Sequence, residues 1–355
     1  MASFSRVVHS TIKEYFRKEE VNILRRRRFL ALLRGAGRIT TGHAGESPDW
    51  KVRYKRAPLI QYADAESASF VRRSKRLTAT LPWRSYLVTD QVTKMEKLQN
   101  NKTEAIIKIM ANVAKELAED LQDQFCEELF VNGDATGNEK RIHGLESALK
   151  GTAAASGGYV VDNSGTYAGL STVLANYGGT WTGTWPDGTG DSHYDFWSGL
   201  LVDYTDTAWA ASTKTWPNTC IEAMRYGIIH AERNDRKLDV ILLEKSLYRQ
   251  FLDAIDDKER IVIDSNKGKS PLYNLGFGEV QHFDGVDITW EHGVPANTGY
   301  GVVLDGVELM SLQPTLFSPE MKDFDMEGMS FRFAVDFYGN MRCNPRKLAK
   351  WKNVT

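Results

Sequence analysis

The longest regular pattern of apolar and polar positions covers residues 103–132 and predicts a helix. Its apolar side chains recur at steps of three and four residues, the spacing of one helix face; they are Ile106, Ile109, Met110, Val113, Leu117, Leu121, Phe125 and Leu129. Such a helix extends about 45 Å, well over twice the usual length. Gly133 stands where a left-handed residue ends many helices, and the polar segment "NGDATGN" around it predicts a turn.

Residues 49–90 show the two-residue alternation of extended strands. Two runs carry it, and the polar segment "ADAESAS" between them is the predicted tip of a hairpin: Trp50, Val52 and Tyr54, then Leu77, Ala79, Leu81 and Trp83. Strands of about fifteen residues extend about 50 Å, and an isolated two-stranded ribbon is marginally stable in water. We therefore expect this hairpin to lie on a neighbouring subunit.

Residues 1–48 have the pattern of an arm rather than of a domain. Apolar residues at helical spacing stand at Ile12, Phe16, Ile23, Leu24 and Leu30. The glycine-rich segment "RGAGRITTGHAGESPD" then breaks the helix. An arm with so few apolar residues needs another surface to hold it folded.

Beyond an irregular, Gly-, Thr- and Trp-rich segment at 151–217, helix and strand patterns alternate. "TCIE" from Thr219 is typical of a capping box and predicts a helix to about Arg233. The continuous apolar run "LDVILLE" predicts a strand covered on both faces, and "SLYRQFLDAI" predicts a second helix. A strand between two helices indicates a compact α/β subdomain.

Two kinds of turn are predicted in the last 80 or so residues. Asp-Gly pairs at 284–285 and 305–306 are typical of tight turns. The terminal segment "SFRFAVDFYGNMRCNPRKLAKWKNV" alternates well enough for two strands joined at Gly339-Asn340.

Composition limits the class of protein. With 42% apolar and 26% charged residues among 355, the chain is long enough for two domains and typical of a soluble globular protein. No apolar run approaches the roughly 18 residues of a membrane span, so we expect no membrane partner. Cys126, Cys220 and Cys343 lie far apart without CxxC spacing, which predicts buried, reduced thiols.

The net charge of −1 conceals an asymmetry. Residues 1–90 hold 19 Lys and Arg against 8 Asp and Glu, a charge of +11, so the remainder carries −12. A basic arm and an acidic body favour attraction between copies, or contact of the arm with nucleic acid.

The order of these parts resembles that of the major capsid proteins of tailed bacteriophages, which have the HK97 fold. The resemblance covers most of the chain and rests on "LFVNGDATGN…IHGLESAL", "TYAGLS", "DFW", "GFGEVQHFDGVDITWEHGVP" and "YGNMRCNPRKLAKWKNV", in family order. It implies an α+β fold with an N-terminal arm at 1–48, an extended loop (E-loop) hairpin at 49–90 and a peripheral P-domain at 91–200, whose spine helix covers about 103–132. An A-domain at 201–325 and C-terminal return strands of the P-domain at 326–355 complete it.

The resemblance also implies a function. A protein of this family assembles as hexamers and pentamers into an icosahedral shell around double-stranded DNA, which it contacts non-specifically. Its partners are further copies, a portal, and scaffold or decoration proteins, and its place is the virion, after assembly in the cytoplasm of a bacterial host. The alternative is an encapsulin-like nanocompartment shell with protein cargo. A cytoplasmic DNA-binding protein or an enzyme is a remote alternative.

Three sets of charged residues are the candidate contacts. In the E-loop we expect intersubunit contacts from Arg53, Lys55, Arg56, Arg72, Arg73, Lys75, Arg76 and Trp83. Their predicted partners lie on or near the spine helix of a neighbour: Glu116, Glu119, Asp120, Asp123, Glu127 and Glu128. The third set, Arg25, Arg26, Arg27 and Arg28, has two interpretations, packaged nucleic acid or the acidic surface of a neighbouring subunit.

Catalytic and ligand motifs give no support to an enzyme. The glycines near Asp134 do not fit a Walker A loop, Asp134 with Glu139 lacks the EF-hand register, and no GxSxG is present. We expect His143 and His282 to be single, hydrogen-bonded or exposed rings, and neither a metal nor a cofactor.

Some relatives join a lysine to an asparagine of a neighbour with the help of a glutamate. The candidates for this cross-link are Lys51, Lys55 and Lys75, then Asn340, Asn344 and Asn353, with Glu320 or Glu327. Since neither glutamate can be placed near the other groups, we expect no cross-link and a non-enzymatic protein.

Overall fold

The computed structural model of the protein describes residues 27–53, 59–62, 64, 70, 72, 74–95, 103–151, 159–161, 163, 165–172, 197–232, 237–256, 272, 275, 280–325 and 330–353. In that part of the chain, no helix is long and apolar enough to cross a membrane.

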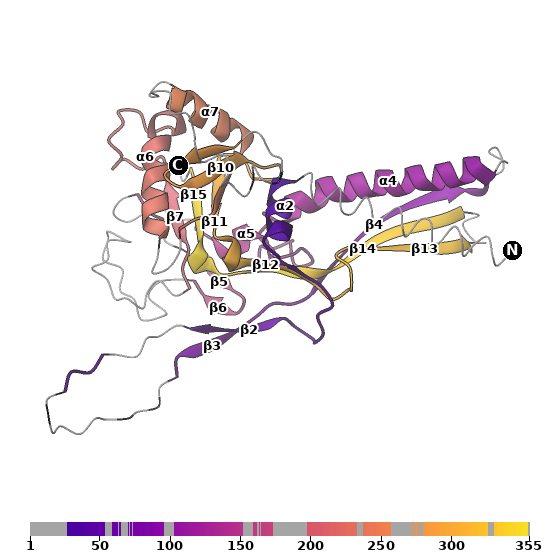
Figure 1. Ribbon diagram of the computed structural model, residues 1–355, viewed down its shortest axis with the longest axis horizontal. Helices are drawn as coiled ribbons and strands as arrows, with labels where there is room; N and C mark the ends of the chain where they lie inside the picture. Colours follow the sequence, from indigo (N-terminus) through magenta and orange to yellow (C-terminus); the bar gives the residue numbers. More distant parts are fainter. Residues whose placement is uncertain are drawn as a thin grey trace.

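A five-stranded sheet with one long helix along it forms the extended half of the molecule (Figure 1). The order is β1 (Ile39–Thr40), β12 (Val307–Ser311), β14 (Ser330–Cys343) and β13 (Ser318–Asp325), and β4 (Arg84–Thr93) pairs with β14. Helix α4 (Thr103–Glu128) lies on this sheet, where the rings of Phe125 and Phe337 are 4.9 Å apart. Leu117, Leu121 and Phe125 are buried, so the predicted apolar stripe faces the core.

A mixed six-stranded sheet forms the compact half. Its order is β7 (Leu200–Asp203), β15 (Leu348–Lys352), β11 (Thr298–Val302), β8 (Val240–Leu243), β10 (Val286–Trp290) and β9 (Gln281–Phe283). Helices α6 (Trp216–Ala231) and α7 (Lys245–Asp256) cover one face (Figure 1). On β8, Ile241 and Leu243 pack toward these helices, while Val240 and Leu242 join the core of the extended half. The expected strand covered on both faces is confirmed.

Smaller elements join the two halves. A hairpin of β2 (Asp49–Arg53) and β3 (Arg76–Thr80) projects from the body (Figure 1). The others are helix α2 (Arg28–Gly35), helix α5 (Leu145–Ala148), the pair β5 (Thr166–Tyr167) and β6 (Leu170–Ser171), and the short 3-10 helices η4 (Leu304–Gly306) and η5 (Pro345–Lys347).

The long helix ends at Glu128, earlier than predicted, and Gly133 is not its left-handed terminal residue. Gly133 is needed for a different reason, because a Cβ there would lie 2.5 Å from the carbonyl oxygen of Ile142. A Cβ on Gly144 would likewise lie 2.5 Å from the carbonyl oxygen of Leu129. The two glycines let the backbone after the helix pass close to the returning chain.

Within the arm, helix α2 packs on the body of the same chain, which agrees with the expectation that the arm needs another surface to hold it folded. Phe29, Leu30 and Leu33 are buried in the main core of the same chain. Residues 1–26 lie outside the described residues.

The C-terminal pattern was interpreted wrongly at Gly339-Asn340, because β14 runs straight through both residues. A side chain at position 339 would meet the carbonyl of Met310 on β12 and the ring of Phe337. The glycine here allows a close approach, which a sequence pattern does not distinguish from a turn.

The two sheets do not follow the expected domain limits. Strands β12 and β13, within 201–325, belong to the five-stranded sheet, and β15, within 326–355, belongs to the six-stranded sheet. Residues 84–90, expected in the hairpin, pair with β14. The chain therefore crosses between the two sheets several times.

Local expectations in the compact half had mixed outcomes. Helix α7 and the turn at Asp284-Gly285 are confirmed, both turn residues having positive φ. Helix α6 begins at Trp216, before the predicted capping box, and Asp305-Gly306 lies in a 3-10 helix that joins strands of different sheets. The three cysteines are free and buried, as expected.

Candidate assembly surfaces

The base of the projecting hairpin is fixed to the body by aromatic packing. The ring of Trp197 lies 6.4 Å from that of Trp50 on β2 and 6.0 Å from that of Tyr167 on β5. The backbone N–H of Thr80 on β3 donates to the carbonyl of Ala168, at 3.1 Å. These contacts join two of the sequence segments that carried the resemblance, "TYAGLS" and "DFW", and they fix the direction of the hairpin.

The described basic residues of the hairpin lie largely in solvent. Arg53, Arg72 and Arg76 are exposed, and Lys75 is half-buried. Lys55, Arg56 and Arg73 lie outside the described residues. Trp83 lies outside the paired strands, and its indole N–H donates to the carbonyl of Gly45 at 3.0 Å within the same chain.

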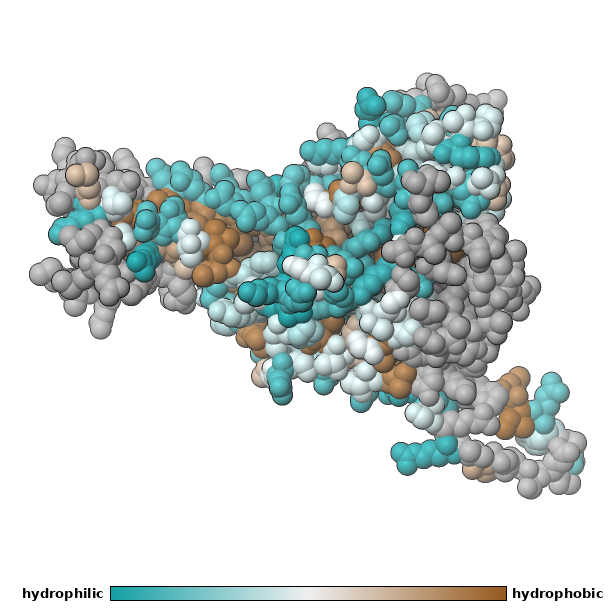
Figure 2. Space-filling model, turned by 180° about the vertical axis from the view of Figure 1, so that it is seen from behind, coloured by the Kyte–Doolittle hydropathy of each residue, from teal (hydrophilic) through white to brown (hydrophobic). Residues whose placement is uncertain are grey.

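The hairpin also carries large apolar side chains that the sequence analysis missed. Phe70 is 95% exposed and Leu59 94%, and Ile60 and Tyr62 are exposed as well. Figure 2 shows apolar atoms on the projecting hairpin, away from the body. The signal was present in "PLIQY" at 58–62, a run of apolar residues in a segment with no partner strand of its own. Exposed apolar groups of this kind mark contact surfaces.

The acidic residues of α4 form a stripe on its solvent face. Glu116, Asp120, Asp123 and Glu127 are all exposed and follow one another at steps of four, three and four residues, which places them on one helix face. Glu119 is exposed beside them. We name these five residues the acidic stripe.

Asp123 and Glu127 of the acidic stripe lie close to basic residues of the same chain. Asp123 forms an ion pair with Arg27, and Glu127 lies 3.7 Å from the ring of His292. Glu128, which we expected to be a further intersubunit partner, turns inward, where Arg141 binds it in a bidentate ion pair and Tyr86 donates a hydrogen bond to it at 2.7 Å.

The described arginines of the arm bind their own chain. Besides the contact of Arg27 with Asp123, the guanidinium of Arg28 lies 4.0 Å from the ring centre of Trp290 and donates to its carbonyl at 2.6 Å. Both arginines therefore fasten α2 to the body. Arg25 and Arg26 lie outside the described residues.

The buried carboxylate of Glu291 forms a hydrogen bond with the start of α2. The Glu291 side chain accepts hydrogen bonds from the backbone N–H of Phe29 and of His292, at 2.7 and 2.8 Å. Burial raises the pKa of Glu291, although these hydrogen bonds and the nearby arginines oppose the shift. The carboxylate acts as a helix cap supplied from a distant part of the chain.

The N-G-D turn is held by a buried hydrogen-bond network. Asn340 accepts from the backbone N–H of His143 and Met341 through Oδ1, at 2.9 and 2.8 Å, so its Nδ2 must be the donor to Nδ1 of His143. The His143 ring therefore carries its proton on Nε2, which lies 3.0 Å from Asp134. Lys150 is the second partner of Asp134.

This network gives the polar turn a structural role. Burial alone would raise the pKa of Asp134, but the hydrogen bonds from His143 and Lys150 lower it. Glu139, which the sequence analysis considered with Asp134 as a cation site and set aside, accepts from the N–H of Gly137 at 2.9 Å. Across the described part of the chain, no group of three or more His, Cys, Asp or Glu side chains is placed to hold a metal ion.

Three of the residues considered for a covalent cross-link are engaged or buried within the chain. Asn340 is fully buried, Lys51 donates to Thr78 at 2.5 Å, and Asn353 accepts from Thr205 at 3.2 Å. The side chains of Glu320 and Glu327 and that of Lys55 lie outside the described part. The interpretation of His282 as a hydrogen-bonded ring is confirmed, since its Nδ1 lies 3.1 Å from Asp287.

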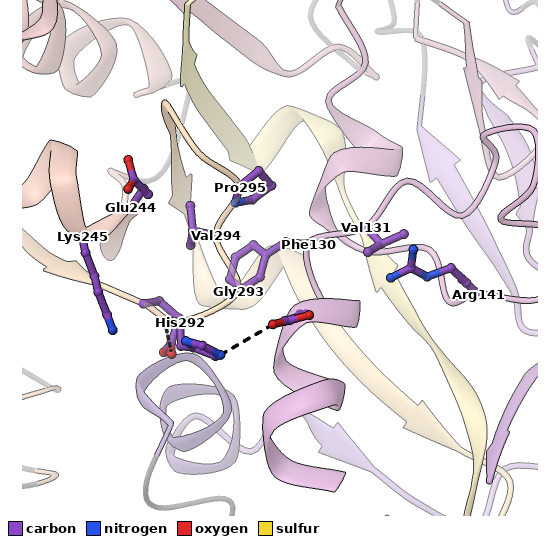
Figure 3. Close-up of a pocket in the computed structure, with 11 residues that line it drawn as sticks. Phe130, Val131, Arg141, Glu244, Lys245, His292, Gly293, Val294 and Pro295 are labelled. Atoms are coloured by element: carbon purple, nitrogen blue, oxygen red, sulfur yellow. Dashed lines mark hydrogen bonds and ion pairs between the residues drawn. The ribbon is translucent and has the colours of Figure 1, made fainter. Parts of the chain in front are cut away.

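A pocket of about 420 Å³ lies between the end of α4, the loop 291–295 and the start of α7. Figure 3 shows Phe130, Val294 and Pro295 grouped on its apolar side. The loop fits tightly against the helix, because Gly293 has a φ of +87° and a Cβ there would lie 2.9 Å from the carbonyl oxygen of Cys126. This is the point where the compact half touches the end of the spine helix.

Comparison with known proteins gives a fold. No family model matches the sequence, and no curated protein matches it. The cyanophage A-1(L) capsid asymmetric unit is similar with a TM-score of 0.59 at 16% identity, over 92% of each chain. The mature capsid of bacteriophage PhiM1 has a TM-score of 0.52 at 11% identity, over 90% of this chain and 87% of that one.

A further similar solved structure is that of an encapsulin. The holo-SrpI encapsulin complex from Synechococcus elongatus PCC 7942 has a TM-score of 0.50 at 11% identity, over 91% of this chain and 87% of that one. All three identities are low, so what they establish is the architecture. The chain has the α+β fold of HK97-type capsid proteins, as the order of its sequence parts predicted.

Proposed function

We propose that this protein is a major capsid protein of a tailed bacteriophage. It assembles as hexamers and pentamers into an icosahedral shell around double-stranded DNA. Assembly takes place in the host cytoplasm, and the shell becomes part of the virion. The protein has no catalytic role. The observation that carries the proposal is the fold match with a phage capsid subunit over 92% of both chains.

The projecting hairpin supports self-assembly. The described residues of its distal part include exposed apolar and basic side chains, which are costly for a protein that stays monomeric. The acidic stripe on α4 offers the opposite charge on the same chain. We propose that the basic residues of one hairpin lie on the acidic stripe of an adjacent copy.

The competing function is a protein nanocompartment, favoured by the match with the SrpI encapsulin complex. The two functions share a shell and differ in what the shell encloses. The fold does not distinguish them, because the TM-scores of 0.52 and 0.50 are nearly equal.

Electron microscopy of the purified protein tests both proposals. The protein is expressed in bacteria and fractionated by size, and its particles are imaged and then treated with nuclease before their contents are analysed. Closed icosahedral particles are expected, and with phage packaging proteins present they should protect double-stranded DNA. Monomers at every salt and protein concentration would contradict a shell, and a co-purifying enzyme in place of DNA would favour the nanocompartment.

A further inference from the structure

The pocket at the end of α4 combines an apolar floor with an acidic mouth. Phe130 and Val294 are buried side chains of the floor, and Pro295 is exposed at its edge. Glu127 and Glu244 line the same pocket, as does His292, whose ring lies 3.7 Å from the Glu127 carboxylate. The Glu244 carboxylate accepts hydrogen bonds from the backbone N–H groups of Ser246 and Asn297, at 3.3 and 3.4 Å.

The cations at the pocket are already engaged. Arg141 forms its bidentate ion pair with Glu128, and the ammonium of Lys245 lies 4.7 Å from the ring centre of Trp290. The mouth therefore suits a group that brings an apolar side chain together with a positive charge.

The hairpin tip has that combination. Phe70 is almost fully exposed, and Arg72, two positions along, is exposed as well. The hairpin leads away from the body that carries the pocket (Figure 1). The chain between the paired strands, residues 54–75, can reach roughly 35 Å beyond the hairpin base when half of it is extended in each direction. A tip that extends this far beyond the body is able to contact a second copy beside it.

We propose that the pocket at the end of α4 receives the hairpin tip of a second copy, with Phe70 on the floor formed by Phe130 and Val294 and with Arg72 beside Glu127. This inference rests on the proposed self-assembly and goes beyond it, because it names the seat of the tip. The same contact would involve the loop 291–295. It would therefore couple the position of one subunit's hairpin to the junction between the two halves of the neighbouring subunit.

A photo-crosslinker tests the seat directly. Benzoylphenylalanine placed at position 70 keeps an aromatic ring there, and irradiated particles are digested and mapped by mass spectrometry. We expect crosslinks to peptides that contain residues 130–131 or 292–295, as covalent dimers. The same probe at Tyr338, which is exposed on β14, is the control and should not label those peptides.

The outcomes separate this inference from the proposed function. Intact particles whose position-70 crosslinks map elsewhere, for example to the exposed Leu87 on β4, would overturn the seat and leave the shell untouched. Absence of particles from unmodified protein would contradict the proposed function itself.

A charge exchange gives a second measurement that does not depend on the probe. Arg72→Glu should lower the crosslink yield from position 70 at least several-fold, and adding Glu127→Arg should restore most of it. Both residues are exposed, so neither substitution should unfold the subunit. Equal yields from wild type, single and double variants would remove Arg72 and Glu127 from the contact and overturn the proposed seat.

Discussion

The Nδ2 atom of Asn340 lies 2.9 Å from Nδ1 of His143, and both side chains are buried. Nδ2 also donates to the carbonyl of Pro82, at 2.7 Å. One amide thus joins three distant parts of the chain: the segment before β4, the turn after the spine helix, and the middle of β14. All its hydrogen-bonding capacity is used, which makes the site sensitive to any change.

Asn340→Ala is expected to destabilise the subunit by about 3 kcal/mol or more, since it leaves several buried polar groups without partners, each at about 1–3 kcal/mol. The measurement is chemical denaturation of the unassembled subunit. Asn218→Ala, which removes an exposed amide at the start of α6, is the matched control and should cost no more than about 0.5 kcal/mol. Equal losses from both variants would contradict the role assigned to the network.

Asp134 makes part of this stability depend on pH. Its pKa in the folded protein is lowered, so the carboxylate stabilises the fold above its unfolded pKa of about 3.9. That contribution is lost as the pH falls below about 4 through the lowered folded pKa. Asp134→Asn should therefore lower stability at neutral pH and flatten its decline below about pH 4. Acid titrations followed by fluorescence measure this loss of stability, and Glu46→Gln, on an exposed side chain, is the control. The prediction would be contradicted if wild type and Asp134→Asn lost stability over the same pH range and by the same amount.

Gly293→Ala and Gly285→Ala separate backbone strain from close packing. Both glycines have a φ of +87°, but a new Cβ meets nothing within 4 Å at Gly285 and meets the backbone of Cys126 and Glu127 at Gly293. We expect a loss of about 1 kcal/mol at Gly285 from the left-handed conformation alone, and clearly more, about 3 kcal/mol, at Gly293 from added overpacking. Thermal unfolding compares the stability of the two variants. Equal losses of stability would show that the loop 291–295 shifts to accommodate the added methyl group.

Trp197 fixes the hairpin base through its rings rather than through its N–H. Among the described residues its Nε1 has no hydrogen-bond partner, while the ring packs against Trp50 and Tyr167. Trp197→Ala should cost about 3–5 kcal/mol and increase protease cleavage of the hairpin. Trp197→Phe should cost less than about 2 kcal/mol, because an aromatic ring remains in place. Similar cleavage in both variants would argue that the hairpin is held by other contacts.

The sequence predicted the parts of the fold that depend on local periodicity. The stripe that includes Leu117, Leu121 and Phe125, the strand 240–243 and the helix 245–256 follow from spacing alone. The end of α4 at Glu128 did not follow from spacing, and Glu128 is bound there by Arg141 and Tyr86 from elsewhere in the chain. A local pattern does not contain those partners.

Strand pairing was the other limit. The sequence placed β15 with the terminal strands of the extended half, whereas it pairs with β7 and β11 in the compact half. Which strands pair is decided by the folded arrangement of the whole chain. Gly339 is ambiguous for a similar reason, since a glycine fits either a turn or a close approach of two backbones. At the candidate contact surface, charge was visible in the sequence, whereas the exposure of Phe70 and Leu59 needed the structure.

The charge contact between hairpin and acidic stripe is tested by reversing three arginines, Arg72, Arg73 and Arg76, to glutamate. A single exposed ion pair contributes only about 0–1 kcal/mol, so one reversal should be tolerated. Three reversals turn attraction into repulsion at every repeat of the contact, and a change of about 1.4 kcal/mol is already tenfold in association.

We therefore expect the triple variant to fold normally, by circular dichroism and thermal unfolding, and to give at least about tenfold fewer particles by size-exclusion chromatography and electron microscopy. Because salt screens exposed charges over about 10 Å at 0.1 M, wild-type particles should also loosen at high ionic strength. The matched control reverses Lys140, Lys237 and Arg249, three exposed cations away from the hairpin, with the same change in net charge. If the triple variant formed particles as well as this control, and both kept wild-type stability in high salt, the charge bridge would be excluded and the apolar tip would remain the contact that holds the hairpin.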